Sequence, residues 1–374
     1  MILQSEVCII RFAENVSAYI PLWFGEGRVY MNIYDISQMT GFSTATVSRV
    51  INGSSNVSEK TREKVLAVIE EYGYTPNVFA RGLGLNTMKT IGVMCTDSSD
   101  RFMAQAIYFL EEYLRKCNYD LILCCTGFDH EIKQKQMKLL LSKRVDAVVL
   151  VGSSYAEDIE ENNRYIIDAA KTVPVMMING MINAPNIFSV VSDDYTAVYD
   201  ITDRLINSGK KKPLYIYNST SNSAMRKLKG FRDAMAANGL EVCEDDLLFI
   251  EPQTIGQKLS AAGYVKEAVS DLEKRTHSFD CAIASDDILA VGALKFAKAS
   301  GLKIPEDFAV TGYNNFDICE CCEPELTSID NHLVTLCEQC VAMLMQIFSD
   351  DAKSVPKQTL FACEIVERGT TMFS

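Results

Sequence analysis

Residues 34–53 read YDISQMTGFSTATVSRVING, and this stretch decides how the N-terminal part of the chain folds. Apolar residues recur at helical spacing in its first part and predict a helix with Ile33, Ile36 and Met39 on the inner side. Gly41 interrupts this helix. Ser43 can cap a second helix, whose inner side carries Val47, Val50 and Ile51. The pattern therefore predicts two short helices joined by a glycine turn.

A third helix is predicted after the loop at residues 52–56. It starts at Ser58, carries apolar residues at i, i+3, i+4 and i+7, and ends at Gly73 and Pro76. Its apolar residues are Val65, Val68, Ile69 and Tyr72. Three short helices within about 45 residues make a compact unit.

The outward side of the second helix has the residue types of a DNA-reading surface: Thr44, Ala45, Thr46, Ser48 and Arg49. Small hydroxyl side chains let a helix approach the DNA backbone closely, and the Arg49 guanidinium can pair bidentately with guanine. The alternative is an ordinary helical hairpin, because polar outward residues are also normal on a solvated helix. Periodicity alone does not decide between these two interpretations.

Charge is distributed unevenly along the chain. The whole sequence has a net charge of −13, which argues against a chain coated in basic surface. Residues 31–89 nevertheless carry six Lys/Arg against five Asp/Glu, whereas residues 90–374 carry 28 against 41. This distribution indicates that a near-neutral head contacts a polyanion, whereas the acidic body is repelled by that polyanion.

Composition excludes several classes of protein. With 48% apolar and 23% charged residues, the chain is neither disordered nor fibrous, and no run reaches the roughly 18–20 apolar residues of a transmembrane helix. The 13 cysteines are diluted in a long chain, and several stand in apolar runs. Such usage favours a reducing cytoplasm over a disulfide scaffold.

Residues 1–30 form the unusual segment. Arg11 and Glu14 interrupt its apolar residues, so it is not a good secretory signal. We expect a non-native or disordered extension, with translation starting at Met31, because GEGR at residues 25–28 can be encoded by a purine-rich stretch that resembles a bacterial ribosome-binding site. The alternative is a genuine flexible extension, and the DNA sequence would decide.

Beyond residue 90 the chain alternates short β-rich apolar runs with amphipathic helices. The predicted strands are 91–95, 121–125, 147–151, 175–178, 214–217, 281–284 and 308–310. The predicted helices are 102–117, 131–142, 195–208, 224–238, 257–275, 287–300 and 333–348. This order predicts parallel sheets with helices on both faces, and about 285 residues are too many for one open sheet. We therefore expect an α/β body of two lobes with a cleft between them.

Several motifs together resemble the lactose/galactose repressor (LacI/GalR) family of transcriptional regulators. In the head they are VSRVIN at residues 47–52, VSEKTREKV at 57–65, GYTPN at 73–77 and ARGL at 80–83. In the body they include KGF at 229–231, ASDD at 284–287, VTGYNN at 310–315, PELTSI at 324–329 and VERGTT at 366–371. The resemblance covers residues 31 to 371.

The resemblance implies a helix-turn-helix headpiece at residues 31–76, a hinge at 77–90 and an effector-binding and dimerisation domain at 91–374. In the family the second helix enters the major groove, where Thr44, Ala45 and Arg49 match, and dimers read palindromic operators. The hinge folds into a helix on DNA and inserts a leucine, here Leu83, into the minor groove. We also assign Asn56, Asn77 and Arg81 to the DNA-binding set.

The body resembles periplasmic sugar-binding proteins, as the family's effector domain does. Ligand groups then come from strand ends that face the cleft. The matching motifs place there Asp97, Asp100, Arg101, Phe102 and Asn179 from the first lobe, and Lys227, Asp286 and Asn314 from the second. Carboxylates and amides of this kind bind sugar hydroxyls, and Phe102 can cover an apolar sugar face.

Alternative roles remain open for these residues. Asp286 can instead cap the helix that follows it, and Asn314 can sit in a turn. Two residues also depart from the family pattern: Asn314 stands where many sugar-responsive members have Asp, and Lys227 where Arg is usual. A typical hexose therefore cannot be assumed as the effector.

Other chemistry is less well supported. The cysteines at 319, 321, 322, 337 and 340 have metal-like spacings, but no further Cys/His set completes a site, so we expect no metal. His130, His277 and His332 each lack the partners of a hydrolytic triad.

We therefore expect a cytoplasmic bacterial transcription regulator of the repressor type, a homodimer that needs no cofactor. It would bind a palindromic operator and a small polar effector, a sugar or sugar derivative. The rival interpretations are a solute-binding protein of a transport system and a Rossmann-type enzyme. Turnover of a ligand would favour the enzyme.

Overall fold

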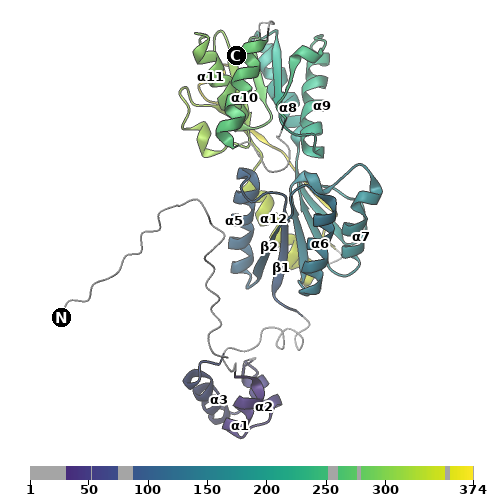
Figure 1. The fold of residues 1–374 in the computed structure, drawn as a ribbon, viewed down its shortest axis with the longest axis vertical. Coiled ribbons are helices and arrows are strands. Elements are labelled where there is room, and N and C mark those ends of the chain that lie inside the picture. Colours follow the sequence, from purple (N-terminus) through teal and green to yellow (C-terminus); the bar gives the residue numbers. More distant parts are fainter. Residues whose placement is uncertain are drawn as a thin grey trace, which may run out of the picture. The chain divides into compact units, whose positions relative to one another are not determined.

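The computed structural model describes residues 31–51, 53–74, 87–251, 260–275, 279–349 and 354–373. The chain divides into two units between residues 84 and 85. The first contains the three N-terminal helices and the second contains the α/β body (Figure 1). No helix among the described residues is long and apolar enough to cross a membrane.

The headpiece consists of three helices around a small apolar core. The helices are α1 (Ile33–Thr40), α2 (Thr44–Ile51) and α3 (Glu59–Glu71). Asn32 caps α1 by accepting from the Tyr34 N–H at 2.8 Å, and Gly41 ends the helix with a φ of 74°, a conformation that suits glycine. The core of this unit is formed by Ile36, Val47, Val50, Val65 and Tyr74.

The first lobe of the body is a six-stranded, fully parallel sheet with the strand order β11-β5-β4-β3-β1-β2. Its strands are β1 (Thr90–Cys95), β2 (Asp120–Cys125), β3 (Ala147–Val151), β4 (Val175–Ile178), β5 (Ile187–Ser192) and β11 (Gln358–Phe361). Helices α5 (Arg101–Lys116) and α12 (Leu333–Phe348) cover one face, and α6 (His130–Ser142) and α7 (Arg164–Ala170) cover the other (Figure 1). Short 3-10 turns follow β3, namely η1 (Ser153–Tyr155) and η2 (Glu160–Asn163).

The second lobe repeats this plan with the strand order β12-β10-β9-β8-β6-β7. Its strands are β6 (Pro213–Tyr217), β7 (Leu247–Phe249), β8 (Cys281–Ala284), β9 (Ala309–Tyr313), β10 (Thr327–Asp330) and β12 (Glu364–Val366). Only the edge pair β10 and β12 is antiparallel. Helices α8 (Asp194–Asn207) and α9 (Asn222–Ala237) pack on one face, and α10 (Ala261–Lys274) and α11 (Asp287–Ala299) on the other. The 3-10 turns are η3 (Glu244–Asp246) and η4 (Asp317–Cys319).

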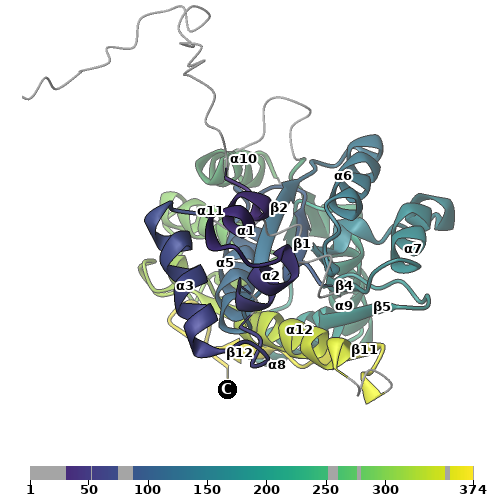
Figure 2. The same cartoon turned by 90° about the horizontal axis from the view of Figure 1, so that it is seen from below.

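The chain crosses between the lobes three times. It leaves the first sheet after β5, returns after β10 to form α12, and leaves again after β11 to add β12 to the second sheet. The view in Figure 2 shows α12 beside β11, where the Thr359 hydroxyl contacts the Met343 sulfur at 3.8 Å. Because two crossings leave from the carboxyl ends of β5 and β10, the carboxyl edges of both sheets lie at the junction of the lobes (Figure 1).

Candidate DNA-binding surface and effector site

The outward side of α2 presents the residues expected to read DNA. Ala45 and Arg49 are exposed, whereas Val47 and Val50 on the same helix are buried in the headpiece core. Thr44, Thr46 and Ser48 are partly buried beside them. The Thr46 N–H donates to the Ser43 hydroxyl at 3.2 Å, which satisfies one amide at the start of the helix.

The other residues of the DNA-binding set lie elsewhere. Asn56 is exposed in the loop between α2 and α3. Asn77, Arg81 and Leu83 lie outside the described residues. Sequence reasoning did not single out Tyr34, whose ring is 69% exposed in the first turn of α1. Helical periodicity alone does not mark Tyr34 as a candidate DNA contact. Its exposure as a large aromatic side chain on a small headpiece does.

In the first lobe, four expected ligand residues lie in or directly after the turn between β1 and α5. Asp97 accepts from the N–H and hydroxyl of Ser99, and Asp100 caps α5 by accepting from the Met103 N–H at 3.1 Å. Burial raises the pKa of Asp100. Phe102 is partly buried and packs against the core of this lobe.

The fifth residue of this lobe, Asn179, follows β4 and is buried with a φ of 61°. Its side-chain oxygen accepts from the Ser192 N–H at 3.0 Å, next to the crossing that leaves β5. Asn179 therefore ties the ends of two neighbouring strands together.

In the second lobe, Asp286 and Asn314 meet at the ends of β8 and β9. One carboxylate oxygen of Asp286 caps α11 by accepting from the Ile288 N–H at 2.7 Å. The other accepts from the Asn314 side-chain amide at 3.2 Å, and Asn331 donates to the Asn314 oxygen at 2.9 Å. The capping role of Asp286 thus occupies one oxygen and leaves the second within an amide network.

Lys227 is a buried cation beside this network. Its ammonium lies 3.3 Å from the centre of the Tyr313 ring and donates to the Ser285 carbonyl at 3.2 Å. Burial lowers the pKa of Lys227, although the carboxylates of Asp194 and Asp286 oppose this effect.

Sequence reasoning missed the buried carboxylates that surround Lys227. Asp193 caps α8 by accepting from the Thr196 N–H at 3.1 Å. Asp194 instead pairs with Arg226 at 2.8 Å and accepts from the Tyr313 hydroxyl at 2.6 Å. Its burial could not be read from the sequence, because its partners stand 32 and 119 residues away.

Acidic groups from both lobes approach one another at the junction. Burial raises the pKa values of Asp286 and of Tyr264 on α10, and the nearby carboxylate of Asp100 raises both further. The two lobes also touch directly, since Arg101 pairs with Asp317 at 3.2 Å and stacks over Phe316. Arg101 thus connects the lobes.

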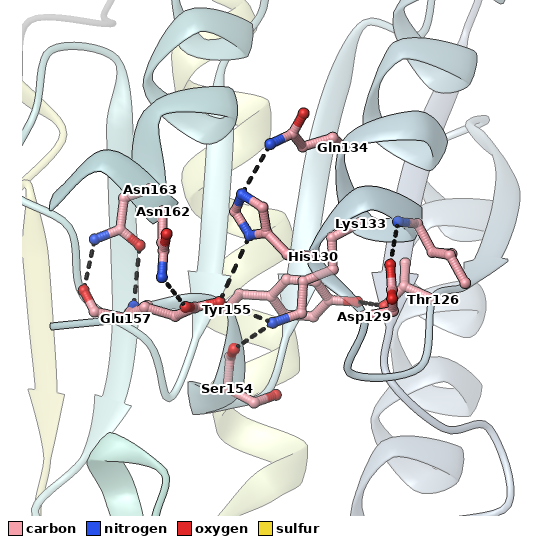
Figure 3. A network of polar contacts seen from close by, with 12 residues as sticks. Thr126, Asp129, His130, Lys133, Gln134, Ser154, Tyr155, Glu157, Asn162 and Asn163 are labelled. Carbon is pink, nitrogen blue, oxygen red and sulfur yellow. Dashed lines mark hydrogen bonds and ion pairs between the residues drawn. The ribbon is translucent and has the colours of Figure 1, made fainter. Parts of the chain in front are cut away.

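A second contact between the lobes rests on a polar network in the first lobe (Figure 3). The Asn222 amide of α9 donates to the Ala156 carbonyl at 2.8 Å. The buried ammonium of Lys133 fixes the turn around Ala156 by donating to the Ser154 carbonyl at 3.0 Å and to Glu157 at 3.2 Å, as Figure 3 shows. Burial would raise the pKa of Glu157, but donors including Asn162 and Lys133 lower it overall.

The paired acids of α11 predict how stability depends on pH. Burial raises the pKa of Asp286 to about 6 and that of Asp287, which also faces Asp286, to about 7. The folded state therefore holds protons that the unfolded state releases near pH 4, and the free energy of unfolding falls as pH rises from about 4 to about 7. We expect Asp286→Asn to flatten this dependence, measured by urea denaturation near pH 5 and near pH 7.5. An unchanged slope would contradict the assignment.

The fold and these surfaces define a class of protein, a helix-turn-helix DNA-binding unit joined to a two-lobed ligand-binding body. Family models match both parts: "Bacterial regulatory proteins, lacI family" matches residues 32–77, and "Periplasmic binding proteins and sugar binding domain of LacI family" matches residues 88–368. The chain belongs to the LacI family of bacterial regulatory proteins. It is thus a DNA-binding transcriptional regulator with an effector-binding domain, and its family is one of regulators and not of enzymes.

Individual relatives agree with this assignment. An HTH-type transcriptional regulator of Lachnoclostridium phytofermentans is 50% identical over 343 residues, which cover 92% of this chain and all of the relative. The HTH-type transcriptional repressor PurR of Vibrio campbellii is 30% identical over 79% of this chain and 86% of its own. The structure of the Lac repressor dimer bound to operator and the anti-inducer ONPF matches with a TM-score of 0.79 and 24% identity, covering 91% of this chain and 99% of that one.

Proposed function

We propose that α2 reads a palindromic operator in the major groove. Arg49, exposed at the last turn of α2, would pair with a guanine, while Thr44, Ala45, Thr46 and Ser48 allow close approach. Asn56 would contact the DNA backbone. The hinge at residues 77–90 would place Leu83 in the minor groove, with Asn77 and Arg81 beside it; this part rests on the sequence motifs.

The effector we propose is a small polar molecule, a sugar or sugar derivative, held where the carboxyl edges of the two sheets meet. The observation that carries this proposal is the convergence of Asp100, Asp286 and Asn314 with the buried cation of Lys227. Oxygen acceptors and amide donors of this kind satisfy hydroxyl groups. Asp97, Arg101, Asn179 and Phe102 would complete the first-lobe side.

A homodimer is supported by apolar side chains left exposed at one edge of the first lobe. Phe128 follows the edge strand β2 with 69% of its surface exposed, and Ile132 and Leu139 are exposed on α6. An exposed apolar set of this kind favours a protein interface. Two such bodies would set the separation of two headpieces, as a palindromic operator requires.

The domain organisation that we propose is an extension at residues 1–30, a headpiece at 31–76, a hinge at 77–90 and an effector domain at 91–374. Since its operator is bacterial DNA, we propose that the protein works in the cytoplasm as a repressor whose affinity for the operator changes when effector binds. A ligand can do this only by binding one arrangement of the lobes better than the other.

A ligand panel scored by thermal unfolding tests the effector proposal. We expect mono- and disaccharides and their phosphorylated or acidic derivatives to include a compound that raises the melting temperature, because a ligand at about 100 times its Kd stabilises the folded state by about 2.7 kcal/mol. Purine bases and amino acids are the comparison set. If only the comparison set stabilises the protein, the proposed class of effector is wrong.

A further inference from the structure

Two cysteine thiols face each other at the carboxyl edge of the first sheet. Cys95 ends β1, Cys125 ends β2, and the two residues are register partners in this parallel pair. Their sulfur atoms are 3.7 Å apart. Cys95 lies two residues after Val93, and Cys125 lies two residues after Leu123. Side chains two apart on a strand share a face, so both thiols lie on the face of the sheet that α5 and α12 cover.

This geometry is within reach of a disulfide. Neighbouring strands lie about 4.8 Å apart, and disulfides join residues whose Cα atoms are about 4.4–6.8 Å apart. Rotation of the two side chains would have to bring the sulfur atoms from 3.7 Å to about 2 Å, with the backbone of each strand in place.

The two thiols differ in access to solvent. Cys125 is exposed, so we expect hydrogen peroxide to reach it before it reaches Cys95. Cys95 is buried, and burial, helped by the adjacent Cys125, raises its pKa to about 12. Cys125 is therefore the sulfur that reacts first, and Cys95 is the sulfur that resolves the product.

We propose that Cys95 and Cys125 form a reversible oxidation site that peroxide closes to a disulfide. Hydrogen peroxide oxidises the Cys125 thiol to a sulfenic acid, with cleavage of the O–O bond and release of one water. The Cys95 sulfur then attacks the Cys125 sulfur, the S–O bond breaks, the S–S bond forms, and the Cys95 proton leaves in a second water. Two thiols lose two electrons in total, and one peroxide is reduced to two waters.

The position of this pair gives the oxidation a consequence for the effector site. Cys95 is followed directly by the turn that carries Asp97 and Asp100, and the Thr126 N–H already donates to the Cys95 carbonyl at 2.9 Å. A covalent link at this point restrains the beginning of that turn. This consequence rests on the proposed effector site, whereas formation of the disulfide does not.

Oxidation of the full-length protein tests the proposal. Treated with hydrogen peroxide, the wild type should lose the mass of two hydrogen atoms, yield a linked peptide containing Cys95 and Cys125, and recover on treatment with dithiothreitol. Cys125→Ser, an exposed substitution, should abolish this loss, whereas Cys243→Ser, at an exposed thiol of the second lobe, should not. Cys95→Ser should trap Cys125 as sulfenic acid, detected with a dimedone probe.

Other products would overturn the proposal. These are an intermolecular disulfide through Cys125, or conversion of Cys125 to sulfinic acid in the wild type as fast as in Cys95→Ser. Hydrogen exchange tests the second step separately, without any effector or DNA. Amides of residues 96–100 should exchange more slowly in the oxidised protein than in the reduced protein. If the disulfide forms and the two exchange rates are equal, the disulfide stands but its proposed effect on the effector site is wrong.

Discussion

Replacing Asp286 by Ala is expected to abolish the response to effector while leaving operator affinity without effector largely unchanged. The carboxylate lies in the amide network with Asn314 and close to Lys227, so its removal takes away an acceptor and leaves a buried cation less compensated. The measurement is operator binding with and without the compound that stabilises the wild type.

The control for this experiment is Glu273→Ala, at an exposed position on α10, which should respond as the wild type does. Asp286 also caps α11, so loss of its cap destabilises the body by about 1 kcal/mol. Asp286→Asn keeps a capping oxygen and should fold better while still failing to respond. If both variants unfold or lose DNA binding outright, the residue serves the fold and the effector assignment fails.

Arg49→Ala is expected to weaken binding to the operator by about 1–3 kcal/mol, which is about 5- to 150-fold. Binding to random DNA should hardly change, because contacts to phosphates remain. The matched control is Lys60→Ala, which removes an exposed cation from α3. This change should weaken binding to operator DNA and to random DNA to the same degree. Equal losses on operator and random DNA for Arg49→Ala would refute base readout by this residue.

The α/β architecture was predictable because its central strands are continuous apolar runs between amphipathic helices. The prediction of parallel sheets with helices on both faces is confirmed, as is the three-helix headpiece. The predicted ranges agree with two observed strands, β3 (Ala147–Val151) and β8 (Cys281–Ala284). Both strands are buried on both faces, and their sequences are therefore continuous apolar runs that are easy to recognise.

Strands β5, β7, β10, β11 and β12 were not predicted, and two of them, β10 and β11, depend on partners far away in sequence. Strand β10, Thr327–Asp330, is polar, and its buried Thr327 and Ser328 bond to Thr370 and Asp287. Edge strand β11 is half exposed and pairs with β5 across more than 160 residues. Neither pattern has the apolar period of an isolated strand, because tertiary hydrogen bonds replace apolar burial.

The candidate site shows the same limit. Motifs located Asp286 and Asn314 at strand ends, and these two side chains do meet. Sequence gave no indication that Arg101 pairs with Asp317 of the other lobe or that Asp194 is buried beside Lys227. Both contacts join residues far apart in sequence, so no local spacing encodes them.

Selection of bound duplexes from a pool of random DNA by the purified full-length protein tests the central claim most directly. We predict that the wild type enriches one sequence with two inverted half-sites, and that the Arg49→Ala variant loses the preference for guanine within each half-site. A pool that stays random after repeated selection, or an enriched site without inverted halves, would contradict it.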